Sequence, residues 1–181
     1  TNRNAALISL NAQRASLGFE RWNDAVNGCD EQSISQQSDG ILADPATKAL
    51  LETVFSYSPY LTQSIVADPA FTCSLFKNGP EWAMNDVLRS ISDARKSVAA
   101  TNEATPALAS ILRKAKRKAS LAIALADISN IWDLERITDA LSDLAEASIS
   151  AAAAHLLGIA AAQGALVLDH PDDFERGSGL V

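Results

Sequence analysis

The sequence predicts an all-α fold, a multi-helix bundle with several short helices and two long antiparallel helices near its C-terminal end. Four prolines follow a residue with a side-chain oxygen, at Asp44-Pro45, Ser58-Pro59, Asp68-Pro69 and Thr105-Pro106. This order is typical of helix starts, because the oxygen accepts a hydrogen bond from a free N–H group and proline needs no donor at the first helical position. Gly79-Pro80 predicts a fifth start. Prolines so placed would interrupt strands.

The chain up to residue 100 is expected to form a series of helices, of which those at 59–67 and 69–77 are short. Apolar residues at helical spacing predict these helices at residues 4–26, 45–57, 59–67, 69–77 and 80–100. Residues 30–40, DEQSISQQSDG, are expected to form a loop instead, because they are polar and offer almost nothing to bury.

Two long helices are expected at residues 106–129 and 134–163, separated by Asn130, Ile131 and Trp132. Asp133 is expected to cap the second one, and so short a break favours antiparallel packing. The predicted seam of the first helix is small and apolar, with Leu108, Leu112, Ala115, Ala119, Ala122 and Ala126. The predicted seam of the second helix contains Leu134, Ile137, Leu141, Leu144, Ser148 and Ala152.

Length and composition are those of one globular domain. The chain has 181 residues, of which 48% are hydrophobic and 20% charged, so it can bury a sizeable core. We expect a helical domain at residues 1–168 and a polar connector at residues 169–181. The formal net charge of −7 argues against a nucleic-acid-binding protein, which is usually basic on at least one face.

Cysteine usage and the apolar segments favour a cytoplasmic protein. Cys29 and Cys73 lack a C-x-x-C spacing and are too few for a disulfide scaffold. No secretory signal opens the chain, and Thr1 in place of Met indicates a piece cut from a longer protein. Residues 151–168 are mostly alanine with a histidine and two glycines, so we expect a buried helix there and no membrane span.

The residues suggest no catalytic, cofactor-binding or metal site. His155 is expected to be a packed or surface histidine, and His170 lies beside acids in a segment without a metal ligand set. Asp139, Asp143 and Glu146 share one helix face, which we interpret as solvated. A small metal or haem protein is a third hypothesis, but two histidines and one methionine hardly supply its ligands.

The run of basic residues at 113–118 is the candidate interaction site. On a helix, its five cations would project from two neighbouring stripes. A solvated face is the plain interpretation, and a surface that contacts another domain or a phosphate is the sharper one. The candidate interface residues are Arg113, Lys114, Lys116, Arg117 and Lys118.

Several motifs together resemble the bacterial glutamine-synthetase adenylyltransferase family, from about residue 41 to residue 181. Lys114 stands where a second arginine is expected and Glu146 where an aspartate is expected, and both keep the charge. The motifs, in order, are SPYL at 58–61, DPAF at 68–71, LRKAKRK at 112–118, ALADI at 124–128, LSDLAE at 141–146 and RGSGLV at 176–181.

The resemblance implies a function for a longer parent protein. Enzymes of that family attach and remove AMP on glutamine synthetase, and each half carries a helical region followed by a nucleotidyltransferase domain. That domain has a G-M-G-K-L-G turn and paired aspartates that hold Mg²⁺, and this sequence contains neither the turn nor an Asp-x-Asp motif. The resemblance therefore implies ATP and Mg²⁺ for the parent enzyme, and glutamine synthetase, the PII signalling protein and the parent's own nucleotidyltransferase domain as partners.

The order of motifs is more similar to the N-terminal half, which is associated with adenylyl removal. We thus expect the helical segment that positions the catalytic domain and its protein substrate, inactive on its own. The alternative is a stand-alone helical interaction module without catalytic activity. A coding frame that continues into a Gly-rich turn would distinguish the first hypothesis from the second.

Overall fold

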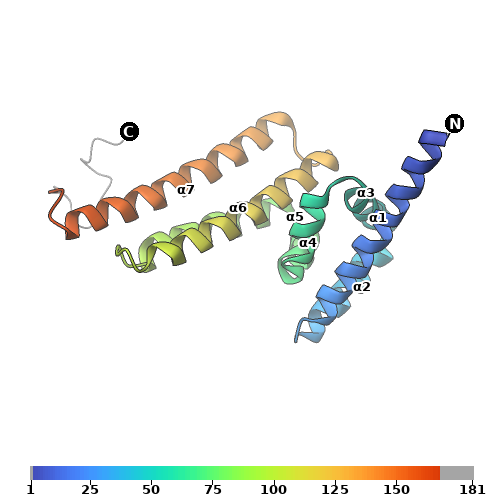
Figure 1. Cartoon of the computed structure of the whole chain (residues 1–181), viewed down its shortest axis with the longest axis horizontal. Coiled ribbons are helices and arrows are strands. Elements are labelled where there is room, and N and C mark those ends of the chain that lie inside the picture. Colours follow the sequence, from blue (N-terminus) through green and yellow to red (C-terminus); the bar gives the residue numbers. More distant parts are fainter. Residues whose placement is uncertain (1, 168–181) are drawn as a thin grey trace. The chain divides into compact units, whose positions relative to one another are not determined.

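The computed structural model describes residues 2–167, with side chains from Leu10 onward. This part of the chain forms seven helices and no strand, which confirms the all-α class (Figure 1). The expected connector at residues 169–181 and His170 lie outside the described residues. The helices are α1 (Asn2–Asn27), α2 (Gln32–Ala43), α3 (Pro45–Tyr57), α4 (Pro59–Val66), α5 (Pro69–Ser97), α6 (Thr105–Ile128) and α7 (Leu134–Ala162).

Three of the predicted proline starts are capped as expected. Asp44 accepts a hydrogen bond from the Thr47 N–H at 2.9 Å, and Ser58 accepts one from the N–H of Leu61 at 3.3 Å. Asp68 accepts from the N–H three residues later at 3.0 Å. The hydrogen bonds from the Thr47 hydroxyl and then from its N–H hold the pKa of Asp44 below its usual value.

The fifth predicted start is a kink inside α5. Gly79 has φ 85° and ψ 171°, a conformation open to glycine and strained for other residues, and Pro80 follows it. The two predicted helices at 69–77 and 80–100 are therefore the two arms of α5, which ends at Ser97.

The prediction of a loop at residues 30–40 was wrong, because this stretch forms most of α2. Two of its side chains are buried, Ile34 and Ser38, four residues apart on one face. The buried Trp22 donates its Nε1–H to Ser38 Oγ at 2.9 Å. One apolar residue and one tertiary hydrogen bond thus hold a helix that hydrophobic periodicity did not reveal.

The predicted cap at Thr105 was also wrong. The N-cap position of α6 is Ala104, in right-handed helical conformation and without a side-chain cap, and Thr105 is the first helical residue. The Thr105 hydroxyl instead lies 2.9 Å from Nε2 of the buried His155, in a hydrogen bond that joins the start of α6 to the late part of α7. The same hydroxyl also donates to the Thr101 carbonyl at 3.3 Å, so it faces back along the chain and does not cap α6.

The chain divides into two compact units, unit 1 from Thr1 to Trp82 and unit 2 from Ala83 onward. Unit 1 packs α1 to α4 and the first arm of α5 around large buried side chains. Thr72 in that arm donates to the Ile65 carbonyl at 3.1 Å. The largest fully buried side chains of unit 1 are Trp22, Leu51, Val54, Ile65, Thr72 and Cys73.

A glycine lets α1 and α3 approach each other closely. A Cβ atom on Gly18 would lie 2.5 Å from Cβ and Cγ of Phe55, a distance that real contacts do not show. Phe55 is buried and also meets Phe19 edge to face, with 5.0 Å between ring centroids. Gly18 is therefore required by its neighbour and not by a turn.

Unit 2 has one core shared by the second arm of α5, α6 and α7. The Thr105–His155 hydrogen bond and the short break at residues 129–133 show that α6 and α7 run antiparallel, side by side (Figure 1). Asp133 caps α7 as predicted, accepting from the Arg136 N–H at 2.8 Å. The core contains Met84, Val87, Ile91, Ala115, Ala119, Ile123, Ala126, Trp132, Ala140, Leu144 and Ala151.

The predicted seam of α6 is confirmed, whereas that of α7 was partly wrong. Leu134 and Leu141, assigned to the α7 seam, are exposed. The face of α7 that packs inward instead carries Ile137, Ala140, Leu144, Ala147 and Ala151. Alanines of both helices pack in this core together with Leu144, and a second set of large α7 side chains stays exposed on another face.

By length and composition, α7 could cross a membrane, with a mean hydropathy of 1.4 in its most apolar window. A core helix passes the same test. The buried His155 and the core residues Ala140, Leu144 and Ala151 give α7 a place in the core of unit 2.

Gly18→Ala is expected to destabilise the protein by about 1–3 kcal/mol, because the added methyl group overpacks the contact with Phe55. Gly40→Ala is the matched control in α2, where a Cβ meets nothing within 4 Å. It is expected to stabilise by up to about 1 kcal/mol through helix propensity. Urea unfolding of both variants measures the difference, and equal effects would contradict the close approach of α1 and α3.

Candidate functional site

The five cations singled out from the sequence lie in the middle of α6 and differ in exposure. Arg113, Lys114 and Lys116 are exposed, whereas Arg117 and Lys118 are half-buried. The Nε atom of Arg117 is buried and has no hydrogen-bond partner. The exposed three are thus available to a partner, and Arg117 is partly committed to packing.

Two of these cations line a groove between α6 and α7. The groove has a volume of about 380 Å³. Arg113 and Lys116 contribute the charge, and no carboxylate lines it. Lys114, Arg117 and Lys118 are not among its lining residues. We call it the α6–α7 groove, lined by Leu112, Arg113, Lys116, Leu141, Leu144, Ala145, Ser148 and Ile149.

Sequence reasoning missed the apolar part of this surface. Four large side chains of α7 are exposed although they lie seven, eight and seven residues apart, on one helix face. We call them the outer stripe: Leu134, Leu141, Ile149 and Leu156. The signal was present in the sequence, because α7 has more apolar residues than one buried face can accept.

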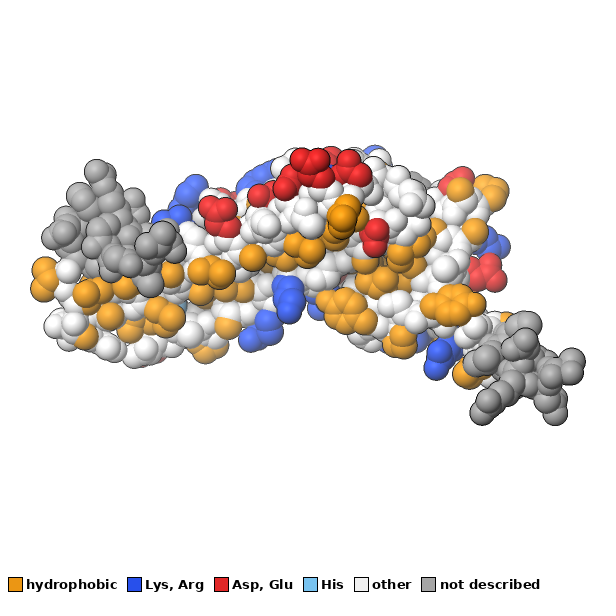
Figure 2. All heavy atoms as spheres, turned by 90° about the horizontal axis from the view of Figure 1, so that it is seen from above, with side chains coloured by type: hydrophobic (Ala, Val, Ile, Leu, Met, Phe, Trp, Pro, Cys, Tyr) orange, Lys and Arg blue, Asp and Glu red, His pale blue; other side chains and the backbone are white. Residues whose placement is uncertain are grey.

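Hydrophobic side chains form a row along unit 2 in Figure 2, with acidic side chains beside it. On α7 the exposed carboxylates are Glu135, Asp139, Asp143 and Glu146. By helical geometry they occupy a face different from that of the outer stripe. The helix thus has three faces, one packed in the core, one apolar and exposed, and one acidic.

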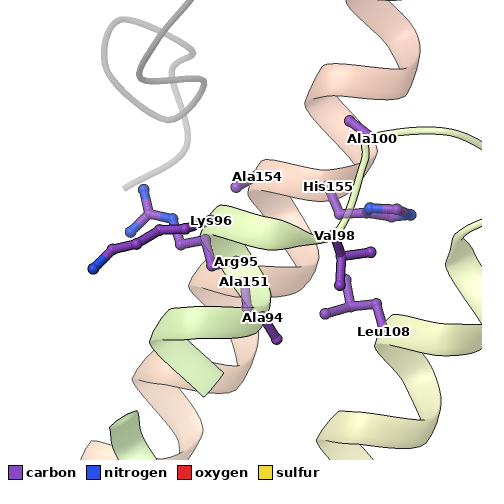
Figure 3. A pocket seen from close by; sticks show the side chains of 9 residues that line it. All are labelled: Ala94, Arg95, Lys96, Val98, Ala100, Leu108, Ala151, Ala154 and His155. Atoms are coloured by element: carbon purple, nitrogen blue, oxygen red, sulfur yellow. The ribbon is translucent and has the colours of Figure 1, made fainter. Parts of the chain in front are cut away.

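A smaller cavity of about 180 Å³ lies at the other end of the helix pair, and His155 is one of its lining residues. Figure 3 shows the His155 ring on one side of this cavity, while Arg95 and Lys96 extend away from it. The polar groups therefore do not converge on one point. His155 is a packed histidine with a hydrogen bond, as one of the sequence interpretations expected.

Ionic and aromatic groups elsewhere in unit 2 hold the fold. The Arg136 guanidinium carbon lies 4.6 Å from the centroid of the buried Trp132 ring, a cation–π contact at the start of α7.

Within residues 2–167, no group of three His, Cys, Asp or Glu side chains could hold a metal ion.

Cys73 does not have the environment of a reactive thiolate. Cys73 is buried, and its Sγ lies 3.9 Å from the Ile34 carbonyl. Burial, with a smaller effect of Cys29, raises the pKa of the Cys73 thiol to about 11. Cys29 is half-buried, and both thiols are free. The thiol of Cys73 therefore stays protonated at neutral pH.

Comparison with known proteins identifies relatives of the chain. The family described as glutamate-ammonia ligase adenylyltransferase matches residues 48–174. The bifunctional glutamine synthetase adenylyltransferase/adenylyl-removing enzyme of Rhodopseudomonas palustris (strain TIE-1) is 36% identical over 169 residues. The enzyme of the same description from Bradyrhizobium diazoefficiens is 32% identical over 163 residues. No solved structure matches the chain.

The chain spans a small part of these relatives. The two alignments cover 91% and 90% of the chain but 16% of each relative. A third relative, from Brucella suis biovar 1, is 34% identical over 131 residues, which are 72% of the chain and 13% of that protein. The matched region includes the whole of α4 to α7.

Cys29 is expected to react with a maleimide at pH 8, whereas Cys73 reacts only after unfolding. Because the pKa of Cys73 rises from 9.0 to about 11 on folding, the folded state resists its ionisation. Stability is therefore expected to fall as the pH rises through 9 toward 11. Mass spectrometry of labelled peptides and unfolding curves at pH 8 and pH 10 measure both effects. Rapid labelling of native Cys73 would contradict its burial.

Proposed function

The chain belongs to the glutamate-ammonia ligase adenylyltransferase family, and from this we propose that it is a helical segment of a longer bifunctional enzyme. The parent enzyme attaches AMP to glutamine synthetase and removes it, as the descriptions of the relatives state for those proteins. The observation that carries the proposal is the match over residues 48–174, which includes the α6–α7 pair.

The segment's role is to position, and the chemistry belongs to a nucleotidyltransferase domain of the parent. The sequence contains neither the G-M-G-K-L-G turn nor an Asp-x-Asp motif. ATP and Mg²⁺ are accordingly assigned to the parent enzyme beyond this segment, and the segment alone is inactive.

The positioning role rests on the construction of unit 2. α6 and α7 are joined by a shared core, a capped turn and the Thr105–His155 hydrogen bond, so the surface between them is held rigidly. Rigid elements fix the geometry of a neighbouring domain better than loops do. In the cytoplasm, the parent enzyme would meet glutamine synthetase and the PII signalling protein as partners in the control of nitrogen assimilation.

The cations on α6 provide the contact with the catalytic domain. Arg113 and Lys116 are the two that are both exposed and set in an apolar groove. A charge beside a surface that becomes dry on docking interacts more strongly with an opposite charge than one in open water. Of the five candidate interface residues, we therefore choose Arg113 and Lys116 for the first experiment.

The double variant Arg113→Glu and Lys116→Glu in the longer enzyme is expected to lower both AMP transfer and AMP removal on glutamine synthetase. Reversal of two interface charges is expected to cost about ten-fold in rate, equivalent to about 1.4 kcal/mol. The helices are expected to stay intact because both side chains are exposed. Steady-state rates and circular dichroism measure the two properties.

The matched control is Arg14→Glu with Lys48→Glu, two exposed cations of unit 1, which changes the net charge equally. Its activity is expected to remain that of the unaltered enzyme. If the α6 variant keeps both activities while folding normally, the assignment of the domain contact to Arg113 and Lys116 fails.

A further inference from the structure

The α6–α7 groove is an apolar surface that unit 2 leaves open. Ile149 is 68% exposed and Leu141 is 50% exposed, although both belong to a helix whose other face is packed in the core. The second arm of α5 contributes Met84, Val87 and Ile91 to that core, and none of them lines the groove. A gathered set of exposed apolar side chains is typical of a surface that meets another protein surface.

The charge at the groove restricts what fits it. Arg113 and Lys116 are its charged lining residues, and Leu112 of α6 lines the groove with them. A complementary occupant presents an apolar surface with carboxylates opposite these two cations. A basic or purely polar surface would leave either the cations or the leucines unmatched.

Continuity of the chain favours one occupant. The outer stripe lies on α7, and the family match continues past the end of α7 at Ala162 to residue 174. The relatives are far longer, since the chain covers 16% of the first of them. A domain joined covalently to α7 meets the groove at an effective concentration that reaches the order of millimolar where the linker is short. An untethered second copy reaches that value only at equally high protein concentration.

We propose that the α6–α7 groove seats the part of the parent enzyme that follows α7, through an apolar surface of that part with carboxylates facing Arg113 and Lys116. The inference rests on the proposed function, because it requires the longer enzyme. It goes further in naming an apolar contact made by Leu141, Ala145 and Ile149, to which the cations form the rim.

Thiol labelling in the groove tests the inference. Ala145 is exposed and lines the groove, so Ala145→Cys introduces a small reporter. A maleimide is expected to label position 145 rapidly in the 181-residue chain and at least about ten-fold more slowly in the longer enzyme. Ser142→Cys, exposed on α7 outside the groove, is the control and is expected to react equally in both. Mass spectrometry of each peptide separates these sites from the native cysteines.

A second substitution connects protection to the groove itself. Leu141→Glu, added to Ala145→Cys in the longer enzyme, places a carboxylate where the occupant is apolar. It is expected to restore rapid labelling at position 145, because the new carboxylate competes for Arg113 and Lys116 and repels the carboxylates of the occupant. The 181-residue chain with the same two changes is expected to label as rapidly as with Ala145→Cys alone, since Leu141 is already exposed there.

Three results would overturn the inference. Equal rates at position 145 in both proteins would show that the groove stays open in the longer enzyme. Slow, concentration-dependent labelling of the 181-residue chain would assign the groove to a second copy. Protection in the longer enzyme that survives Leu141→Glu would place the contact elsewhere.

Activity of the same longer enzyme separates this inference from the proposed function. AMP transfer and removal on glutamine synthetase together with an open groove would leave the proposed function standing and the docking inference refuted. A protected groove in a protein without either activity would leave the docking inference standing and refute the proposed function.

Discussion

The close contact of α6 and α7 through alanines is the constraint on which the candidate site depends. Ala115, Ala119 and Ala126 of α6 share a core with Ala140 and Ala151 of α7, and all five are almost fully buried. Small residues at a helix contact allow the two backbones to lie near each other. Leu144 of α7 also lies in this core and Ile137 packs against it, whereas other large side chains of α7 lie on a different face and are exposed. The exposed outer stripe is thus a consequence of how the core is packed, and the α6–α7 groove lies between that stripe and the basic residues of α6.

Much of the fold could be predicted because its signals are local. Asp44, Ser58, Asp68 and Asp133 cap helices where the sequence indicated, since a cap depends on residues within one turn. The kink at Gly79 is equally local. The errors arose where a distant partner decides the outcome. α2 needs Trp22 as partner for its buried Ser38, and Thr105 gives up a cap for a hydrogen bond to His155, fifty residues away.

The basic part of the candidate site could be predicted from the sequence, and its apolar part could not. The basic residues of α6 are visible in the sequence as a charge run, and exposure then separates Arg113 and Lys116 from the half-buried Arg117. The apolar half depends on which face of α7 the core takes. Leu134 and Leu141 fit a helical seam as well as Ala140 and Ala147 do, and large side chains are the more common choice for a buried face. Only the packing against the alanines of α6 reverses that choice.

A structure of the longer enzyme tests the central claim most directly, namely that the α6–α7 pair is a platform for the domain that follows it. Our account predicts that Leu141, Ala145 and Ile149 are covered by that domain, with carboxylates of the domain beside Arg113 and Lys116. A structure in which the same side chains face solvent, with the catalytic domain seated on another surface of the helices, would contradict it.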